Sequence, residues 1–69
     1  MSIESIDVDN NTQIDVIYNN NASTEIIVTI LNTNFKTPDG NDIILTIPVG
    51  GYTEASYLKI NNIIYVRGC

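Results

Sequence analysis

The feature that most restricts the fold of this chain is the concentration of β-branched and aromatic residues in short segments separated by turn-forming residues. Isoleucine, valine, threonine and tyrosine make up 29 of the 69 residues, and these residue types are enriched in pleated sheets. No segment shows the apolar period of about 3.6 residues, with caps at its ends, that is typical of an amphipathic helix. The sequence therefore predicts an all-β protein without a substantial helix.

Five apolar segments lie between clusters of asparagine, glycine and proline, and each is predicted to form strand. The last segment divides at Asn61-Asn62 into two strands joined by a two-residue hairpin, because asparagine tolerates a positive φ. Thr37-Pro38-Asp39-Gly40 predicts a longer hairpin loop between the third and fourth segments, and Gly50-Gly51 ends the fourth. The five segments are Ser2–Val8, Gln13–Tyr18, Thr24–Leu31, Asp42–Val49 and Ser56–Arg67.

The length of 69 residues predicts one domain, residues 1–69, near the lower size limit for a self-sufficient core. We expect a small antiparallel β-sandwich or barrel-like domain of about five to six short strands. A single cysteine, Cys69, provides no internal disulfide to stabilise such a fold. We interpret it as an inert terminal thiol, with an intermolecular crosslink as the alternative.

The predicted strands are apolar on both faces. In Thr24–Leu31, side chains alternate so that Ile26, Val28 and Ile30 point one way and Ile27 points the other. The segments that follow show the same two-sided pattern. A sheet that buries one face and exposes the other should instead alternate cleanly between apolar and polar residues.

A sandwich of this size buries about one face of each sheet, so the second apolar face predicts a protein partner. Burying one isoleucine is worth about 1.5–3 kcal/mol, which is a large fraction of a small domain's stability. We expect a homo-oligomer or a multicopy assembly component, and a compact monomer with a few surface isoleucines is the alternative. The predicted core residues are Ile26, Val28, Ile30, Leu45 and Ile47, and the predicted partner contacts are Ile27, Ile44, Ile64 and Tyr65.

The sequence offers little to catalysis, cofactors or metals. It has no histidine, and its one cysteine is terminal, so the usual pairs of nucleophile and base are absent. We predict that the protein is not an enzyme and needs no cofactor. Residues 7–12 and 39–42 are rich in oxygen ligands, but residues 7–12 lack the glycine at position six and lead to no bidentate glutamate at position twelve of a calcium loop. A turn is the better interpretation of both, and a structural cation is the alternative.

The charge balance argues against nucleic acid as a partner. Eight acidic residues face three basic ones, Lys36, Lys59 and Arg67, giving a net charge of −5, whereas phosphate binding needs clustered cations. No apolar run approaches the roughly 18 residues of a membrane span, and no signal-peptide pattern is present. We expect a soluble, unprocessed protein that does not bind membranes.

The order of strands and turns resembles that of small β-rich virion proteins of tailed bacteriophages. Those proteins carry a leader strand, a T-x-I-V strand ending in Asn-Thr, a Pro-x-Gly-Gly turn and a closing hairpin that begins L-K-I. The resemblance covers most of the chain at the level of pattern. The matching segments are Ile14–Tyr18, Thr24–Val28 with Asn32-Thr33, Ile47–Gly51, Leu58–Ile60 and Ile64–Val66.

The resemblance implies a structural role in the virion, as a capsid decoration (cement) protein or a minor head, neck or tail component. Such proteins are typically multicopy and contribute no catalytic residues. The alternative hypothesis is a small acidic inhibitor that blocks a bacterial defence protein in the host cytoplasm. Nucleic-acid mimics of that kind usually carry denser rows of acids than a chain with 16% charged residues, so the virion role is preferred.

Overall fold

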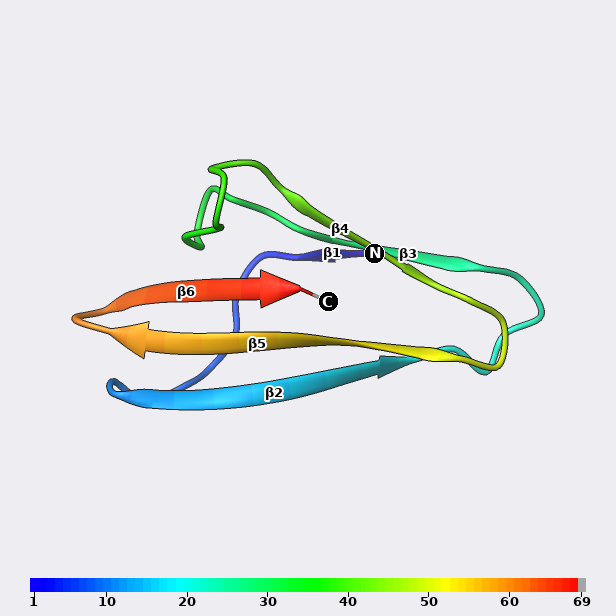
Figure 1. Ribbon diagram of the computed structural model, residues 1–69, viewed down its shortest axis with the longest axis horizontal. Helices are drawn as coiled ribbons and strands as arrows, with labels where there is room; N and C mark the ends of the chain where they lie inside the picture. The colour runs from blue at the N-terminus through cyan, green and yellow to red at the C-terminus, as the bar shows by residue number, and fades with distance from the viewer. Residues whose placement is uncertain (69) are drawn as a thin grey trace.

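The computed structural model describes residues 1–68 as six strands connected by turns and loops, with no helix in that range (Figure 1). Cys69, predicted to be an inert terminal thiol or an intermolecular crosslink, lies outside the described residues. No helix within residues 1–68 has the length and apolar character needed to cross a bilayer. The strands are β1 (Ser2–Ile3), β2 (Thr12–Asn19), β3 (Ile26–Ile30), β4 (Ile43–Ile47), β5 (Tyr52–Ile60) and β6 (Ile63–Gly68).

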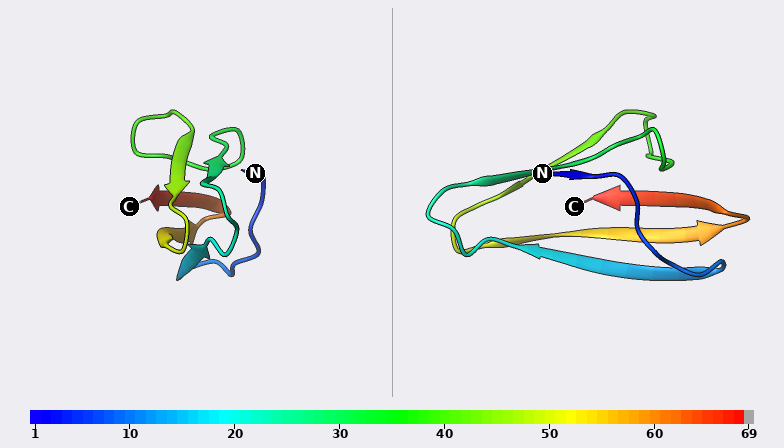
Figure 2. Two further views of the ribbon diagram at one scale, coloured as in Figure 1. Left: turned by 90° about the vertical axis from the view of Figure 1, so that its right-hand side faces the viewer. Right: turned by 180° about the vertical axis from the view of Figure 1, so that it is seen from behind.

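The strands form two three-stranded sheets, ordered β1-β3-β4 and β2-β5-β6. All neighbouring strands are antiparallel except β1 and β3, which pair in parallel over two residues. The end-on view shows the two sheets as separate layers (Figure 2). The predicted fold class, a small antiparallel β-sandwich or barrel-like domain of about five to six short strands, is confirmed in its sandwich form.

The two predicted hairpins are present. Asn61 and Asn62 join β5 to β6 with φ values of 51° and 66°, the left-handed geometry that a two-residue hairpin requires. The loop containing Pro38 and Gly40 joins β3 to β4, and Gly40 has a φ of 77°. Both turns form where local residue chemistry favours them, which explains why they are readable without tertiary information.

Most strand boundaries lie within two residues of the prediction, and two differ by four or more. β1 stops at Ile3, because the following residues leave the first sheet and cross to the second, where β2 begins at Thr12 (Figure 1). β5 begins at Tyr52 instead of Ser56, because the eight residues of β2 supply partners from Tyr52 to Lys59. The mixed polarity of Tyr52–Ala55 contains no apolar run, so only pairing with β2 defines this part of the strand.

The core lies between the two sheets and is built from residues at alternate strand positions. Of the five predicted core residues, Val28, Ile30, Leu45 and Ile47 are buried, and Ile26 is half-buried against them. The second sheet contributes Ala55, Tyr57 and Val66, and the loop after β3 contributes Phe35. The Phe35 and Tyr57 rings lie 5.8 Å apart at 57°, within the range of favourable aromatic contacts.

Tyr57 is the largest fully buried side chain, and its hydroxyl is paired with that of Tyr18 at 2.7 Å. The pair satisfies a polar group that would otherwise be costly to bury. Burial, together with the hydrogen bond from the neighbouring hydroxyl, raises the pKa of Tyr57 above the ordinary value for tyrosine.

Asn20, at the end of β2, is the buried polar residue of the fold, with 1% of its surface exposed. Its Nδ2 donates to the carbonyls of Thr24 and Ile47 at 2.9 and 3.0 Å, and its Oδ1 accepts from the Ala22 N–H at 2.8 Å. The Asn20 N–H donates to the Gly51 carbonyl, and the Asn20 carbonyl accepts from the Gly50 N–H. One residue therefore ties the β2–β3 connection to the β4–β5 connection.

Asn20→Ala should lower the free energy of unfolding by about 2–4 kcal/mol, because two carbonyls and one N–H lose their partner in a buried site. Asn20→Asp should also be destabilising, since a carboxylate cannot donate to the Thr24 and Ile47 carbonyls. Urea denaturation measures both effects. The control is Asn21→Ala at the exposed neighbouring position, and an equal loss in the control would contradict the role assigned to Asn20.

The free energy of unfolding should fall as pH rises above about 10, because the unfolded tyrosine ionises there while folded Tyr57 keeps its proton. Tyr57→Phe should make this alkaline decline shallower. Tyr52→Phe, at an exposed position, should leave it unchanged. Denaturant titrations at a series of alkaline pH values make the comparison, and identical slopes for wild type and Tyr57→Phe would refute the expectation.

Candidate functional site

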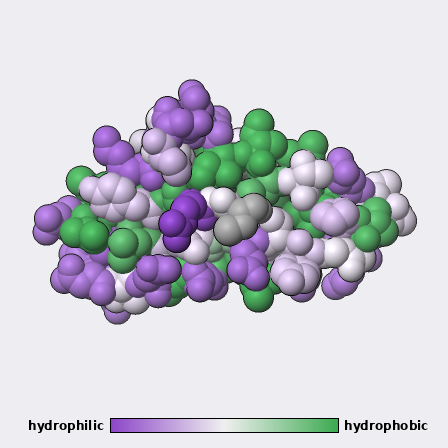
Figure 3. Space-filling view, in the orientation of Figure 1, coloured by the Kyte–Doolittle hydropathy of each residue, from purple (hydrophilic) through white to green (hydrophobic). Residues whose placement is uncertain are grey.

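Large apolar side chains lie exposed on the outer faces of both sheets. Strand alternation places one apolar set in the core and leaves the other outward, as the sequence pattern predicts. Green, hydrophobic atoms reach the surface above β4 in the space-filling view (Figure 3). The exposed large apolar residues are Met1, Ile17, Ile27, Ile44, Val49, Tyr52, Ile60, Ile63 and Tyr65.

The outer face of the first sheet carries no charge on its strands. Ile27 pairs with Thr46 across β3 and β4, and Thr29 pairs with Ile44, so the two isoleucines lie on a diagonal. Ser2 extends the same row from β1. We call these five residues the β3–β4 outer face. Ile27 and Ile44 are 50% and 66% exposed, and no acidic or basic strand residue separates them.

The free edge of β4 adjoins this face. The Met1 ammonium donates to the Ile27 carbonyl, and the Thr29 N–H donates to the Met1 carbonyl, so these β3 residues turn their main-chain groups towards β1 and the residue before it. The alternate residues of β3 therefore bond to Ile43, Leu45 and Ile47 of β4. By the same alternation, the N–H and C=O groups of Ile44 and Thr46 point away from the sheet, where another strand can pair with them.

The four predicted contact residues do not form one surface. Ile27 and Ile44 are exposed on the first sheet, and Tyr65 is exposed on the second. Ile64, also predicted as a partner contact, is half-buried and packs against the core. Alternation along β6 makes this unavoidable, since consecutive residues point to opposite faces. Ile63 is the exposed neighbour that shares the face of Tyr65.

Ile17 is an exposed apolar residue that the prediction missed. It lies on β2, and its side chain is opposite in direction to those of Ile14 and Val16, which pack against the core. The alternation in Gln13–Tyr18 already contained this signal, because Ile14 and Val16 share one parity and Ile17 has the other.

The outer face of the second sheet is ordered in rows across the strands. One row runs from Gln13 on β2 through Leu58 and Tyr65 to Lys36, which joins the edge of β6 by a single parallel bridge. The Lys36 N–H donates to the Ile64 carbonyl at 2.8 Å, and the Lys36 carbonyl accepts from the Val66 N–H at 2.9 Å. The loop before β4 therefore extends this sheet by one residue.

The next row contains Asp15, Ser56 and Arg67. The Ser56 hydroxyl donates to the Asp15 carboxylate at 2.6 Å. Two strand spacings, about 9–10 Å, separate the Asp15 and Arg67 positions, and no ion pair joins any two of residues 1–68. Arg67 therefore has no ion-pair partner within residues 1–68, although Asp39 and Asp42 line an adjoining hollow with it.

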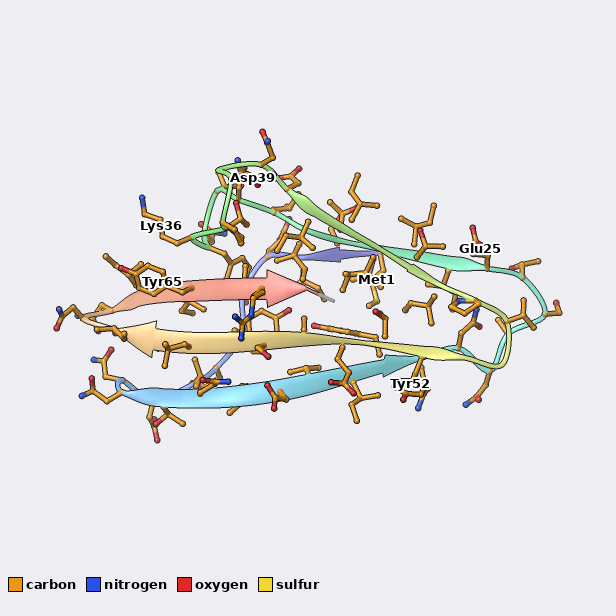
Figure 4. The ribbon with its side chains drawn as sticks, viewed as in Figure 1. Met1, Glu25, Lys36, Asp39, Tyr52 and Tyr65 are labelled. Carbon is orange, nitrogen blue, oxygen red and sulfur yellow. The ribbon has the colours of Figure 1, made fainter. Side chains whose placement is uncertain are left out.

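A hollow of about 300 Å³ lies where these two rows meet the loop after β3. Leu58, Tyr65 and Pro38 provide apolar lining, and Lys36 and Arg67 place two cations beside it. Figure 4 shows Lys36 and Tyr65 at the same end of the molecule, next to the β5–β6 hairpin. We call this feature the β6–loop hollow.

The acidic turns show no arrangement for catalysis. Within the described residues, no three His, Cys, Asp or Glu side chains cluster as a metal site would require. The Asn41 N–H donates to the Asp39 carboxylate at 3.0 Å and holds its pKa below the usual value. The Asp42 carboxylate accepts from the Asn32 N–H at 2.8 Å. These carboxylates are acceptors in turns, as the preferred interpretation of residues 39–42 expects.

The chain matches no protein-family profile, no curated protein and no solved structure.

Thr37→Val should raise the free energy of unfolding by about 1 kcal/mol. The Thr37 hydroxyl is buried and has no hydrogen-bond partner among residues 1–68, so a methyl group of similar shape removes an uncompensated desolvation cost. Thermal or urea denaturation measures the change. Thr46→Val, at an exposed position, is the control, and destabilisation by Thr37→Val alone would mean that the hydroxyl has a stabilising partner.

Proposed function

We propose that this protein is a non-enzymatic assembly component that binds other protein subunits through its outer sheet surfaces. The observation that carries the proposal is the uncharged β3–β4 outer face, where Ile27 and Ile44 are exposed side by side with threonines. Contiguous apolar surface on a small soluble domain is typical of a protein-interaction site. Covering this face with a partner removes both isoleucines from water, and each contributes a favourable free energy of burial.

The free edge of β4 supports the same proposal by a second kind of interaction. The outward N–H and C=O groups of Ile44 and Thr46 are available for addition of a strand from a partner. In strand addition the main chain supplies hydrogen bonds, and the adjoining side chains supply specificity. Edge and face lie next to each other, so a single partner strand and its own sheet would engage both.

The setting that best fits this chemistry is a virion lattice, in keeping with the resemblance to small phage virion proteins. A capsid decoration or minor head or tail protein needs surfaces for protein contacts and no catalytic groups. The acidic residues lie in separate loops and strands, from Glu4 before the crossover to Glu54 on β5, and do not form one row. This distribution favours the assembly role over an acidic mimic of nucleic acid.

The double substitution of Ile27 and Ile44 by lysine should abolish assembly, because it places two charges in a contact that excludes water. Stability should change little, since both side chains are exposed in the isolated chain. Light scattering coupled to size-exclusion chromatography would report the assembly state, and urea denaturation the stability. Ile17→Lys, on the outer face of the other sheet, is the matched control.

The copy number of the protein in purified virus particles provides an independent test. A decoration or lattice protein should be present in stoichiometric multiples of the major capsid or tail subunit, as measured by quantitative mass spectrometry. A protein that is absent from particles, and monomeric at millimolar concentration, would overturn the proposal.

A further inference from the structure

We propose that the β6–loop hollow binds an acidic segment of a partner protein, with an apolar side chain in the hollow and carboxylates against Lys36 and Arg67. The inference rests on the proposed function, because it names the partner chemistry of the second of the two outer surfaces. It depends on a different sheet and on different residues from the β3–β4 outer face.

The hollow is formed by the register in which β5, β6 and Lys36 pair. Leu58 and Tyr65 are direct cross-strand partners on β5 and β6, and the Lys36 bridge extends their row to the sheet edge. Arg67 lies two residues beyond Tyr65 on the same strand, so both side chains project from the same face. The loop then passes over this region through Pro38, which forms one side of the hollow. Two cations and three apolar side chains thus converge from segments about 30 residues apart.

The volume suits a side chain better than a complete small molecule. The hollow of about 300 Å³ equals the lower limit of small-molecule pockets, which range over roughly 300–1,000 Å³ and enclose most of the ligand. An open hollow of this size accommodates one aromatic or branched side chain while the segment that carries it remains on the surface. Half-buried Leu58 and exposed Tyr65 offer the apolar contact.

Charge complementarity favours a negatively charged partner segment. The chain has a net charge of −5 and only three cations, yet two of the three lie at this hollow. Neither Lys36 nor Arg67 has an ion-pair partner among residues 1–68. The acidic neighbours accept hydrogen bonds from other groups: Asp15 from Ser56, and Asp39 and Asp42, which line an adjoining hollow with Arg67, from the Asn41 and Asn32 N–H groups. A carboxylate placed here gains two opposite charges, whereas a basic segment would meet repulsion.

The acidic remainder of the surface restricts the partner to a short, local anionic segment. A long polyanion such as nucleic acid would extend beyond the two cations and approach the excess acids of the chain. A peptide segment with acids flanking one apolar residue contacts only the hollow and its rim. This chemistry also differs from that of the uncharged β3–β4 outer face, so the two surfaces would hold different partners or different parts of one partner.

The test uses two capped peptides, acetyl-Glu-Asp-Phe-Asp-Glu-amide and its neutral counterpart acetyl-Gln-Asn-Phe-Asn-Gln-amide. Each is titrated into the ¹⁵N-labelled full chain while amide chemical shifts are recorded. We expect shift changes confined to residues 36–38, 56–58 and 65–67, with a Kd for the acidic peptide at least tenfold below that for the neutral one. Added salt should weaken the acidic peptide selectively.

Three variants assign the binding to the hollow. The double substitution Lys36→Ala with Arg67→Ala should raise the Kd of the acidic peptide at least tenfold. Tyr65→Ser should weaken both peptides, because it removes apolar lining. Lys59→Ala is the matched control: Lys59 pairs with Ile64 on the opposite face of the same sheet, so its removal should change the Kd less than twofold. Dispersed amide spectra establish that each variant is folded.

Several outcomes would overturn the inference. These are equal affinity for the two peptides, shift changes centred on other residues, no binding at millimolar peptide, or an equal effect of Lys59→Ala. Dissociation of a wild-type oligomer by the double cation variant would show that a second copy of the chain occupies the hollow, which also contradicts a distinct acidic partner. Equal affinity for the two peptides, together with assembly that depends on Ile27 and Ile44, would refute this inference while leaving the proposed function intact.

Discussion

The buried amide of Asn20 is the interaction on which the arrangement of the two sheets depends. Asn20 directly follows β2 of one sheet, and its side chain donates to the carbonyl of Ile47, which ends β4 in the other. Its main chain is bonded to the Gly50-Gly51 turn that leads into β5. A buried amide that lost any of these partners would be costly, so the network specifies one relative position of the two connections. The inner apolar faces then pack against each other at that end of the sandwich.

A core closed in this way leaves both outer faces as surfaces with distinct chemistry. The first sheet exposes isoleucine and threonine beside an unpaired strand edge, and the second exposes an apolar hollow beside two cations. Neither surface contains the convergent titratable groups that catalysis needs. The outer isoleucines of the first sheet are half or more exposed in the isolated chain, and we propose that they contact other subunits.

Features that depend on neighbouring residues were predictable. The hairpin at Asn61-Asn62 and the loop at Pro38–Gly40 follow from residues that tolerate the required φ values, and Val28, Ile30, Leu45 and Ile47 follow from strand alternation. Features that depend on distant partners were not. The early end of β1 and the early start of β5 are decided by which sheet each strand joins. Ile64 was expected at a partner contact because both faces of β6 carry apolar residues, whereas the structure packs it against the core.

The sequence by itself determined the all-β class, the two local hairpins and the presence of more apolar strand surface than one small core contains. These properties arise from residue propensity and from the two-residue period of a strand, which act over a few neighbours. Tertiary structure alone decided the parallel β1–β3 pairing, the buried hydrogen bonds of Asn20 and the position of Lys36 beside Tyr65 and Arg67 at the β6–loop hollow. Each of these joins segments far apart in the chain, and their contacts depend on a register that becomes defined only when both sheets pack around the common core.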